Sequence, residues 1–143
     1  MLSKASANWQ GNLFEGAGTT TLESGAAVAL PVSWASRTEA ANGKTNPEEL
    51  IAAAHAACFS MALSNELAKA GHLAENLETS ALATAGKTDA GWRLLTMALT
   101  VRGTVPGLDA DGFAAIAVIA KDGCPVSNAL AGNVEITLDA ALS

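Results

Sequence analysis

A long alanine-rich segment, residues 46–70, constrains the fold of this chain more than any other part of its sequence. Asn46 is suited to cap a helix and Pro47 to occupy the first helical position. Two glutamates follow in the first turn, where the helix dipole favours negative charge. Gly71 is typical of a helix end. We therefore expect one helix from about residue 47 to residue 70.

The apolar residues of this helix are not confined to one side. Between residues 50 and 63 only His55 and Ser60 are polar. This pattern predicts burial on all sides rather than along one stripe. Hydrophobic residues make up 50% of the chain, and nearly half of them are alanine, with 32 residues. Because the alanine side chain is small, some packing surface must bring backbones close together. We expect a long buried central helix.

Short apolar runs predict strands before and after this helix, and two further helices near the end of the chain. The order of elements indicates an α+β fold with an antiparallel sheet, and the length fits a single domain over residues 1–143. The predicted elements are two or three strands in residues 3–30, a loop over 30–45, a hairpin of 77–87 with 92–105, helices from about 109 to 123 and 125 to 130, and a strand over 134–140.

Charge and hydropathy exclude several classes of function. The net charge is −6 and the basic residues are scattered, which disfavours nucleic acid as a partner. The N-terminus has no apolar signal region, and we expect no run of about 18 apolar residues that would span a membrane. These features predict a soluble, cytoplasmic protein.

The two cysteines are the candidates for chemistry, because a pair in a reducing compartment is more often catalytic, metal-binding or simply buried than a permanent disulfide. Cys58 lies within the long helix and, taken alone, fits an inert core thiol. Cys124 precedes Pro125 at the predicted start of a helix, where backbone N–H groups stabilise a thiolate. Local electrostatics therefore favour Cys124 as the thiolate, and either cysteine could be the nucleophile.

Arg37 is one of three arginines and lies in the predicted loop. A solvated loop arginine is the simplest interpretation of this position. A fixed guanidinium beside a thiol would favour the thiolate and donate hydrogen bonds to an oxygen under attack. Glu48 and Glu49 are the carboxylates that could hold it in place, although both also fit ordinary charge at a helix start.

The spacing along the helix suggests that a second copy of the chain completes the site. Ten residues separate Glu48 from Cys58, or about 15 Å along one helix. Two such helices packed antiparallel about a two-fold axis near Ala53 would bring Glu48 of one copy level with Cys58 of the other. We therefore expect a homodimer with composite sites.

Other chemistries have weaker support. A metal site would need His55, Cys58 and His72 to converge with carboxylates, and no Cys-x-x-Cys motif is present. His55 fits a packed helix residue and His72 a surface or capping residue. Ser60 and Ser64 have no evident His/Asp partner, and no nucleotide-binding motif occurs.

Two cysteine motifs carry a resemblance to a known family. NPEELIAAAHAACFSMAL over residues 46–63, with GCPVS over 123–127, resembles the OsmC/Ohr family of thiol peroxidases, in its OsmC (osmotically inducible protein C) branch. The similarity covers essentially the whole chain and includes WQG, TLESG, DAGW, VPGLD and EITLD at residues 9–11, 21–25, 89–92, 105–109 and 135–139.

The resemblance implies an intertwined homodimer with two active sites at its interface. It implies that Cys58 is the peroxidatic cysteine, Cys124 the resolving cysteine, Arg37 the active-site arginine and Glu48 the carboxylate that holds it. This assignment reverses the local preference for Cys124. We expect Arg37 to outweigh the helix dipole, because it carries a full charge and a dipole end carries only about half of one.

The activity implied is reduction of organic hydroperoxides, and more weakly of hydrogen peroxide, in oxidative or osmotic stress defence. Cys58 would form a sulfenic acid and then a disulfide with Cys124. No bound cofactor or metal is implied, and an external dithiol, a dihydrolipoyl group, would reopen the disulfide. The alternatives are a redox sensor, or a stress-binding protein that uses the same cysteines without catalytic turnover.

Overall fold

The computed structural model describes all residues, 1–143, and divides into two compact units, Met1–Leu50 and Ile51–Ser143. The boundary falls near the start of a helix that begins in the first unit and continues in the second. Each unit is described by itself. The expectation of a single domain stays a prediction.

The first unit is built on a three-stranded antiparallel sheet of β1 (Ala5–Gln10), β2 (Ala17–Leu22) and β3 (Leu30–Ser33), in that order. These strands confirm the pattern in residues 3–30. The expectation of a loop over 30–45 is wrong in part, because this segment contains β3 and a one-turn helix, α1 (Ala35–Thr38). Elements of four residues are too short to produce a readable periodicity.

The second unit contains a sheet in the order β4 (Asn76–Thr88), β5 (Gly91–Thr104), β6 (Glu135–Leu142). β4 and β5 form the predicted antiparallel hairpin, but β5 and β6 are parallel. The prediction of an antiparallel sheet is therefore wrong for this pair. Two helices connect β5 to β6, and such a crossover brings the chain back in the same direction.

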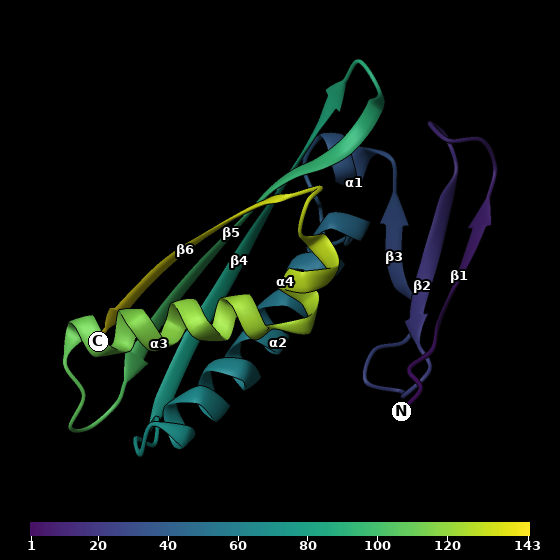
Figure 1. The fold of residues 1–143 in the computed structure, drawn as a ribbon. Coiled ribbons are helices and arrows are strands. Elements are labelled where there is room, and N and C mark those ends of the chain that lie inside the picture. Colours follow the sequence, from purple (N-terminus) through teal and green to yellow (C-terminus); the bar gives the residue numbers. More distant parts are fainter. The chain divides into compact units, whose positions relative to one another are not determined.

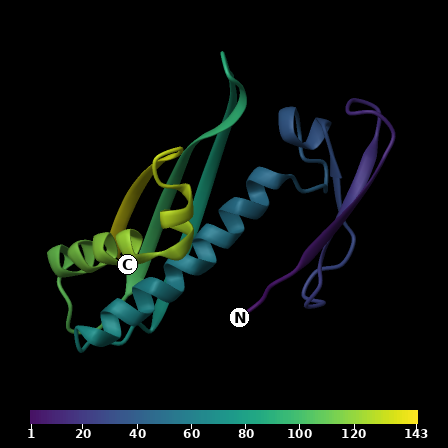
Figure 2. The same cartoon turned by 45° about the vertical axis from the view of Figure 1, so that its right-hand side comes forward.

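Three helices belong largely to this unit: α2 (Pro47–Lys69), α3 (Ala110–Gly123) and α4 (Pro125–Leu130). Their bounds confirm the predicted helix starts. Asn46 Oδ1 accepts the N–H of Glu49 at 2.8 Å, and Asp109 Oδ1 accepts the N–H of Gly112 at 2.7 Å. Figures 1 and 2 show α2 and α3 on the same face of the β4–β5–β6 sheet.

The core of the second unit lies between these helices and the sheet. Phe113 of α3 packs at its centre, and a Cβ added at Gly103 of β5 would lie 2.6 Å from the Phe113 ring. Glycine at this strand position therefore makes room for the aromatic side chain. The other buried members of the core are Phe59, Leu63, Leu67, Leu99, Val101, Val105, Ala117, Ala120 and Cys124.

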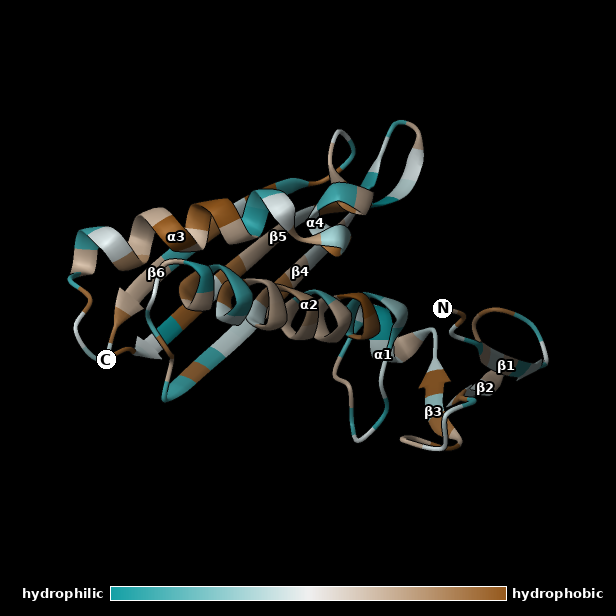
Figure 3. Cartoon of the chain, turned by 60° about the horizontal axis from the view of Figure 1, so that its bottom comes forward, coloured by the Kyte–Doolittle hydropathy of each residue, from teal (hydrophilic) through white to brown (hydrophobic).

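Within one chain, α2 is buried along a single stripe and not on all sides as the sequence predicts. The buried stripe is Ala52, His55, Phe59, Leu63 and Leu67. The opposite face, which includes Ala54, Ala57 and Met61, is exposed. Figure 3 shows hydrophobic residues along both α2 and α3.

Helix α2 is strongly hydrophobic although most of its residues are not buried within one chain. An 18-residue window of α2 has a mean hydropathy of 1.2, although only 22% of that window is buried. By length and composition alone the helix could cross a membrane, which corrects the expectation that no segment meets this test. The core helix of a soluble protein meets the same test, because alanine and leucine dominate both.

Candidate active site

The two cysteines lie near each other in the second unit. Both are free thiols, and each shifts the pKa of the other. Cys58 lies in the middle of α2 and is half-buried, whereas Cys124 is fully buried at the N-cap of α4. A reversible disulfide requires two cysteines whose side chains lie this close to each other.

The two thiols differ in acidity. Burial raises the pKa of Cys58, and the neighbouring Cys124 raises it further against one N–H bond from Val126. Burial also raises the pKa of Cys124, but bonds from the Ser127 N–H, Cys58, the Ser127 hydroxyl and the Val126 N–H outweigh it, so this pKa is lowered. Cys124 is the more acidic thiol of the chain, in agreement with the prediction from its position at the start of α4.

A buried histidine and serine lie beside this pair. His55 Nε2 is 2.7 Å from Ser127 Oγ, and the two side chains come from α2 and α4. His55 is 0% and Ser127 5% exposed. The other ring nitrogen, Nδ1, is buried without a hydrogen-bond partner, so no carboxylate orients the ring as a catalytic triad would require.

Cys58 lines a pocket of about 490 Å³ between α2 and α3. Met61, Ile119 and Pro125 contribute apolar surface, and Asn65 and the ion pair of Glu66 with Lys69 line the same pocket. Its size and mixed lining suit a small organic ligand.

Arg37 and Glu48 form an ion pair in the first unit. Arg37 Nε donates to Glu48 Oε2 at 3.1 Å and Nη2 donates to Oε1, so the contact is bidentate. Burial raises the pKa of Glu48, but the hydrogen bonds and the charge of Arg37 outweigh it, so this pKa is lowered. Glu49 instead accepts a hydrogen bond from Thr45 at 2.6 Å, so Glu48 is the carboxylate that holds Arg37.

Local hydrogen bonds explain why Arg37 meets the start of α2. Ser36 Oγ lies 2.8 Å from the carbonyl oxygens of both Ser33 and Thr45, which closes the segment that carries α1. Asn46 caps α2 and donates from its amide to the Ser36 carbonyl at 2.9 Å. The residue that starts α2 therefore also fixes the turn of α1 that presents Arg37.

The guanidinium of Arg37 lies over an aromatic ring. It lies 5.5 Å from the ring centre of Trp34, and Phe14 packs edge-on against the same ring at 6.0 Å. A pocket of about 360 Å³ beside Arg37 is lined mainly by apolar groups from Trp9, Leu13, Val32, Trp34 and Pro47. An apolar pocket with one cation suits a ligand that has an apolar body and a polar end.

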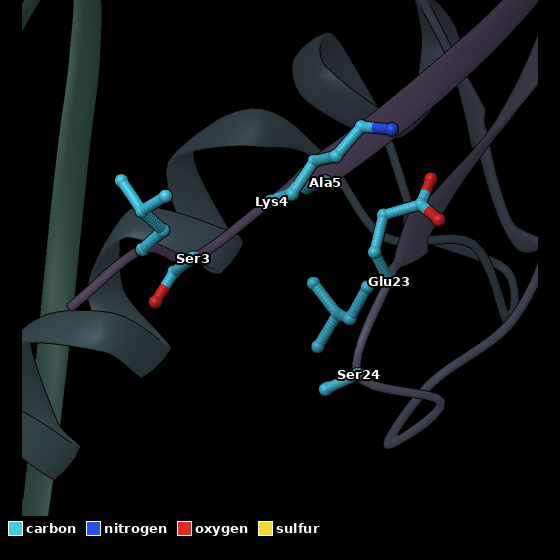
Figure 4. A pocket seen from close by; sticks show the side chains of 7 residues that line it. Ser3, Lys4, Ala5, Glu23 and Ser24 are labelled. Carbon is cyan, nitrogen blue, oxygen red and sulfur yellow. The ribbon is translucent and has the colours of Figure 1, made fainter.

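A larger pocket of about 600 Å³ lies between the N-terminal segment and the end of β2 (Figure 4). Lys4 and Glu23 are its only charged lining residues. It contains no cysteine, histidine or arginine. Its residues offer no nucleophile, and we do not assign it to the reaction.

All four predicted site residues therefore occur in pairs. Cys58 and Cys124 meet within residues 51–143, and Arg37 and Glu48 meet within residues 1–50. The catalytic roles expected for them stay predictions. Phe59, the residue after Cys58, is fully buried in the core and does not line the pocket at Cys58.

Ser127 was not among the residues predicted for the site, and His55 was expected to be a packed helix residue rather than part of the site. The sequence does contain one indication for Ser127. Ser127 stands three positions after Cys124, and the third residue of a helix faces the N-cap side chain. The His55 contact had no readable signal, since 72 residues separate it from Ser127.

The fold and the paired thiols define an α+β protein built for thiol redox chemistry, and comparisons identify its family. The family model described as "OsmC-like protein" matches residues 40–139. The chain is 47% identical over 136 residues to Peroxiredoxin OsmC of Escherichia coli K12, covering 95% of this chain and 93% of that protein.

More distant relatives belong to the Ohr branch. The chain is 36% identical over 99 residues to organic hydroperoxide resistance protein OhrA of Bacillus subtilis, covering 68% of this chain and 67% of that protein. The crystal structure of OhrB of Bacillus subtilis superposes with a TM-score of 0.76 at 26% identity, covering 96% of this chain and 97% of that one. The chain therefore belongs to the OsmC-like family, in its OsmC branch.

Proposed function

We propose that this protein is a cysteine-based peroxidase that reduces hydroperoxides through Cys58 and Cys124. The observation that carries the proposal is a pair of neighbouring free thiols, one half-buried beside a pocket and one fully buried. The family and the names of its relatives, a peroxiredoxin and an organic hydroperoxide resistance protein, support the same reaction.

In the first step the Cys58 thiolate attacks the terminal oxygen of the hydroperoxide. The O–O bond breaks, an S–O bond forms, and the alkoxide leaves as an alcohol after it takes up a proton. Cys58 becomes a sulfenic acid. The accessibility of Cys58 supports its role as the attacking thiol, since Cys124 is fully buried.

In the second step Cys124 attacks the sulfur of the sulfenic acid, which forms the Cys58–Cys124 disulfide and releases water. An external dithiol, for which we propose a dihydrolipoyl group, then reopens the bond by exchange. Both cysteines return as thiols, and the dithiol leaves as a disulfide. The cycle suits the cytoplasm, where we place the protein in defence against oxidative or osmotic stress, because reducing equivalents are available there.

A homodimer would bring the Arg37 guanidinium of one subunit to Cys58 of the other. None of the causes that set the pKa of Cys58 is a positive charge, and their sum raises it. Antiparallel packing of two copies of α2 would bring the Arg37–Glu48 pair of one subunit level with Cys58 of the other. The exposed apolar face of α2, with Ala54, Ala57 and Met61, supports this contact.

Organic hydroperoxides are the preferred substrates in this proposal. The pocket at Cys58 contains Met61 and Ile119, and the pocket at Arg37 contains Trp34 and Leu13. Apolar surface near both reacting groups stabilises an alkyl or aryl substituent, and hydrogen peroxide has none.

Repeated turnover tests the function. Wild-type protein should consume tert-butyl hydroperoxide continuously when dihydrolipoamide is supplied, and Cys58→Ser should lose this activity. Cys124→Ser is the matched control, since it keeps the attacking thiol and should still react once with one equivalent of hydroperoxide. Oxidation of the wild type by a single equivalent without further turnover would instead identify a redox sensor.

The dimer has its own test. Ala57→Asp places a charge on the exposed face of α2 within the proposed contact, and sedimentation should show a monomer. Ala68→Asp is the matched control, because residue 68 is also exposed on α2 but lies beyond the overlap expected about Ala53. A wild-type monomer with full activity would exclude the composite site.

A further inference from the structure

A buried polar chain leads from the second cysteine into the core of the Ile51–Ser143 unit. His55 Nε2 lies 2.7 Å from Ser127 Oγ, and Ser127 lies one turn beyond Cys124 on α4, close enough for its hydroxyl to lower the pKa of the Cys124 thiol. The three side chains are 0%, 5% and 0% exposed. Polar groups buried among apolar side chains are costly unless they are bonded, so this chain fixes its members in one arrangement.

The direction of these hydrogen bonds follows from the unpartnered ring nitrogen of His55. Nδ1 is buried with no partner, and a buried N–H without an acceptor is more costly than a bare lone pair. The proton therefore belongs on Nε2, which donates to Ser127 Oγ. The Ser127 hydroxyl is left to donate to Cys124. Burial lowers the pKa of His55, in keeping with a neutral ring.

We propose that Ser127 donates the hydrogen bond that makes Cys124 reactive in disulfide formation, and that His55 is the positioning residue that fixes this donor. The proposal rests on the peroxidase function above. The Cys124 sulfur attacks the Cys58 sulfur of the sulfenic acid, the S–S bond forms and the S–O bond breaks. The hydroxide that leaves combines with the proton lost by Cys124 to give water, so atoms and charge balance.

The proposed role of Ser127 is in the second step of the cycle, disulfide formation, and this step protects Cys58 from over-oxidation. A sulfenic acid that waits for its partner can react with a second hydroperoxide and become a sulfinic acid, which ends the cycle. A donor held against Cys124 favours its thiolate, so it shortens this wait. The attack on hydroperoxide consumes Cys58 and does not use Cys124, so the two steps can be separated experimentally.

Few titratable groups face Cys124. Cys58 of α2 contacts it directly and His55 of α2 acts through Ser127, whereas α4 has no titratable side chain. At the end of α3, Lys121 and Asp122 pair with each other at 2.5 Å. The β5 strand contributes apolar residues to the same core cluster. A change at Ser127 should therefore report on the Cys124 sulfur alone once Cys58 is removed.

The first test is independent of peroxidase activity. Thiolate absorbance against pH in Cys58→Ser gives the pKa of Cys124, and adding Ser127→Ala should raise that pKa by about one unit, the effect of one hydrogen bond to a charged sulfur. Ser60→Ala in the same background is the matched control, because Ser60 bonds to Thr79 at 2.8 Å and not to a cysteine. An unchanged Cys124 pKa in the Ser127 variant would overturn the proposal.

The second test follows one turnover in the presence of both cysteines. With one equivalent of tert-butyl hydroperoxide, Ser127→Ala should slow disulfide formation about tenfold near neutral pH and move its pH midpoint upward by about one unit. His55→Leu should act in the same direction, and His55→Gln, whose amide can donate near the position of Nε2, should recover part of the rate. His72→Gln is the histidine control, since His72 lies outside this chain of bonds.

The outcomes separate the two proposals. A wild-type protein that forms no disulfide with hydroperoxide refutes the peroxidase function, whereas a normal disulfide rate and midpoint in Ser127→Ala refutes the role of Ser127. Circular dichroism and thermal unfolding check each variant. If His55→Leu does not fold, Ser127→Ala and His55→Gln still decide the question, because both keep the buried volume nearly unchanged.

Discussion

The thiol pair, Cys58 and Cys124, and the ion pair, Arg37 and Glu48, are held in place by different interactions. Cys124 is part of the hydrophobic core and its neighbours there are neutral donors. Arg37 and Glu48 lie near the surface, with side chains 33% and 17% exposed, and attract each other as charges. One unit therefore contains the two thiols, and the other contains the arginine and glutamate expected to act with them.

This difference separates stability from chemistry. A pair embedded in the core depends on packing, so damage to the core should disturb the thiols and the fold together. A partly exposed ion pair contributes little to stability, typically below about 1 kcal/mol. Its bidentate geometry is therefore better explained by a functional role than by the stability of the fold.

Truncating the core should have the largest effect. Phe113→Ala should lower the free energy of unfolding by about 3–5 kcal/mol, because a large cavity would form next to Gly103. Urea unfolding measures it. Phe14→Ala is the matched control in the other unit, where the ring is 74% exposed and contacts Trp34, and it should cost about 1 kcal/mol or less. Equal costs at the two positions would contradict the contrast between the regions.

Removing the cation should affect activity and leave stability nearly unchanged. Arg37→Met should reduce hydroperoxide turnover about a hundredfold, since the donors that stabilise the breaking O–O bond are lost, with less than about 1 kcal/mol lost in unfolding. Arg37→Lys keeps the charge but not the bidentate bond, so its turnover should lie between those of the wild type and Arg37→Met. Full turnover in Arg37→Met would leave Arg37 without a role in the reaction.

Neutralising the carboxylate should have a smaller effect. Glu48→Gln should lower turnover about tenfold, because Arg37 remains but loses the charge that holds it. Glu49→Gln is the matched control, since Glu49 bonds to Thr45 and not to Arg37. The two variants are compared by steady-state kinetics, and an equal effect would mean that charge at the start of α2 matters and the contact with Arg37 does not.

The pH dependence of stability should show the smallest effect. The pKa of Glu48 is lowered in the folded chain, so its pairing stabilises the protein above the pH at which an unpaired glutamate titrates, about 4.3, and this contribution is lost as pH falls through the lowered value. The difference between wild type and Glu48→Gln should be below about 1 kcal/mol at neutral pH and vanish in acid. Urea unfolding at a series of pH values measures it. A difference that grows in acid would contradict the assigned ion pair.

Much of the secondary structure could be predicted from short sequence patterns. Asn46 and Pro47 fixed the start of α2, because capping depends on residues within one turn. The sequence left Asp109 and Asp111 as alternative caps of α3, and the structure shows that Asp109 is the cap. The parallel pairing of β6 was not readable. Strand direction depends on where the chain returns after a crossover, and alternation of side chains is the same in both directions.

The candidate site divides in the same way. The sequence by itself determined which residues could react: two cysteines, an arginine, and a carboxylate at the start of a long helix, recognisable because their types and spacing are local properties. Only the tertiary structure decided that Glu48 rather than Glu49 meets Arg37, and that His55 reaches Cys124 through Ser127. Such contacts depend on the packing of side chains from different elements, and no local pattern encodes the distance between them.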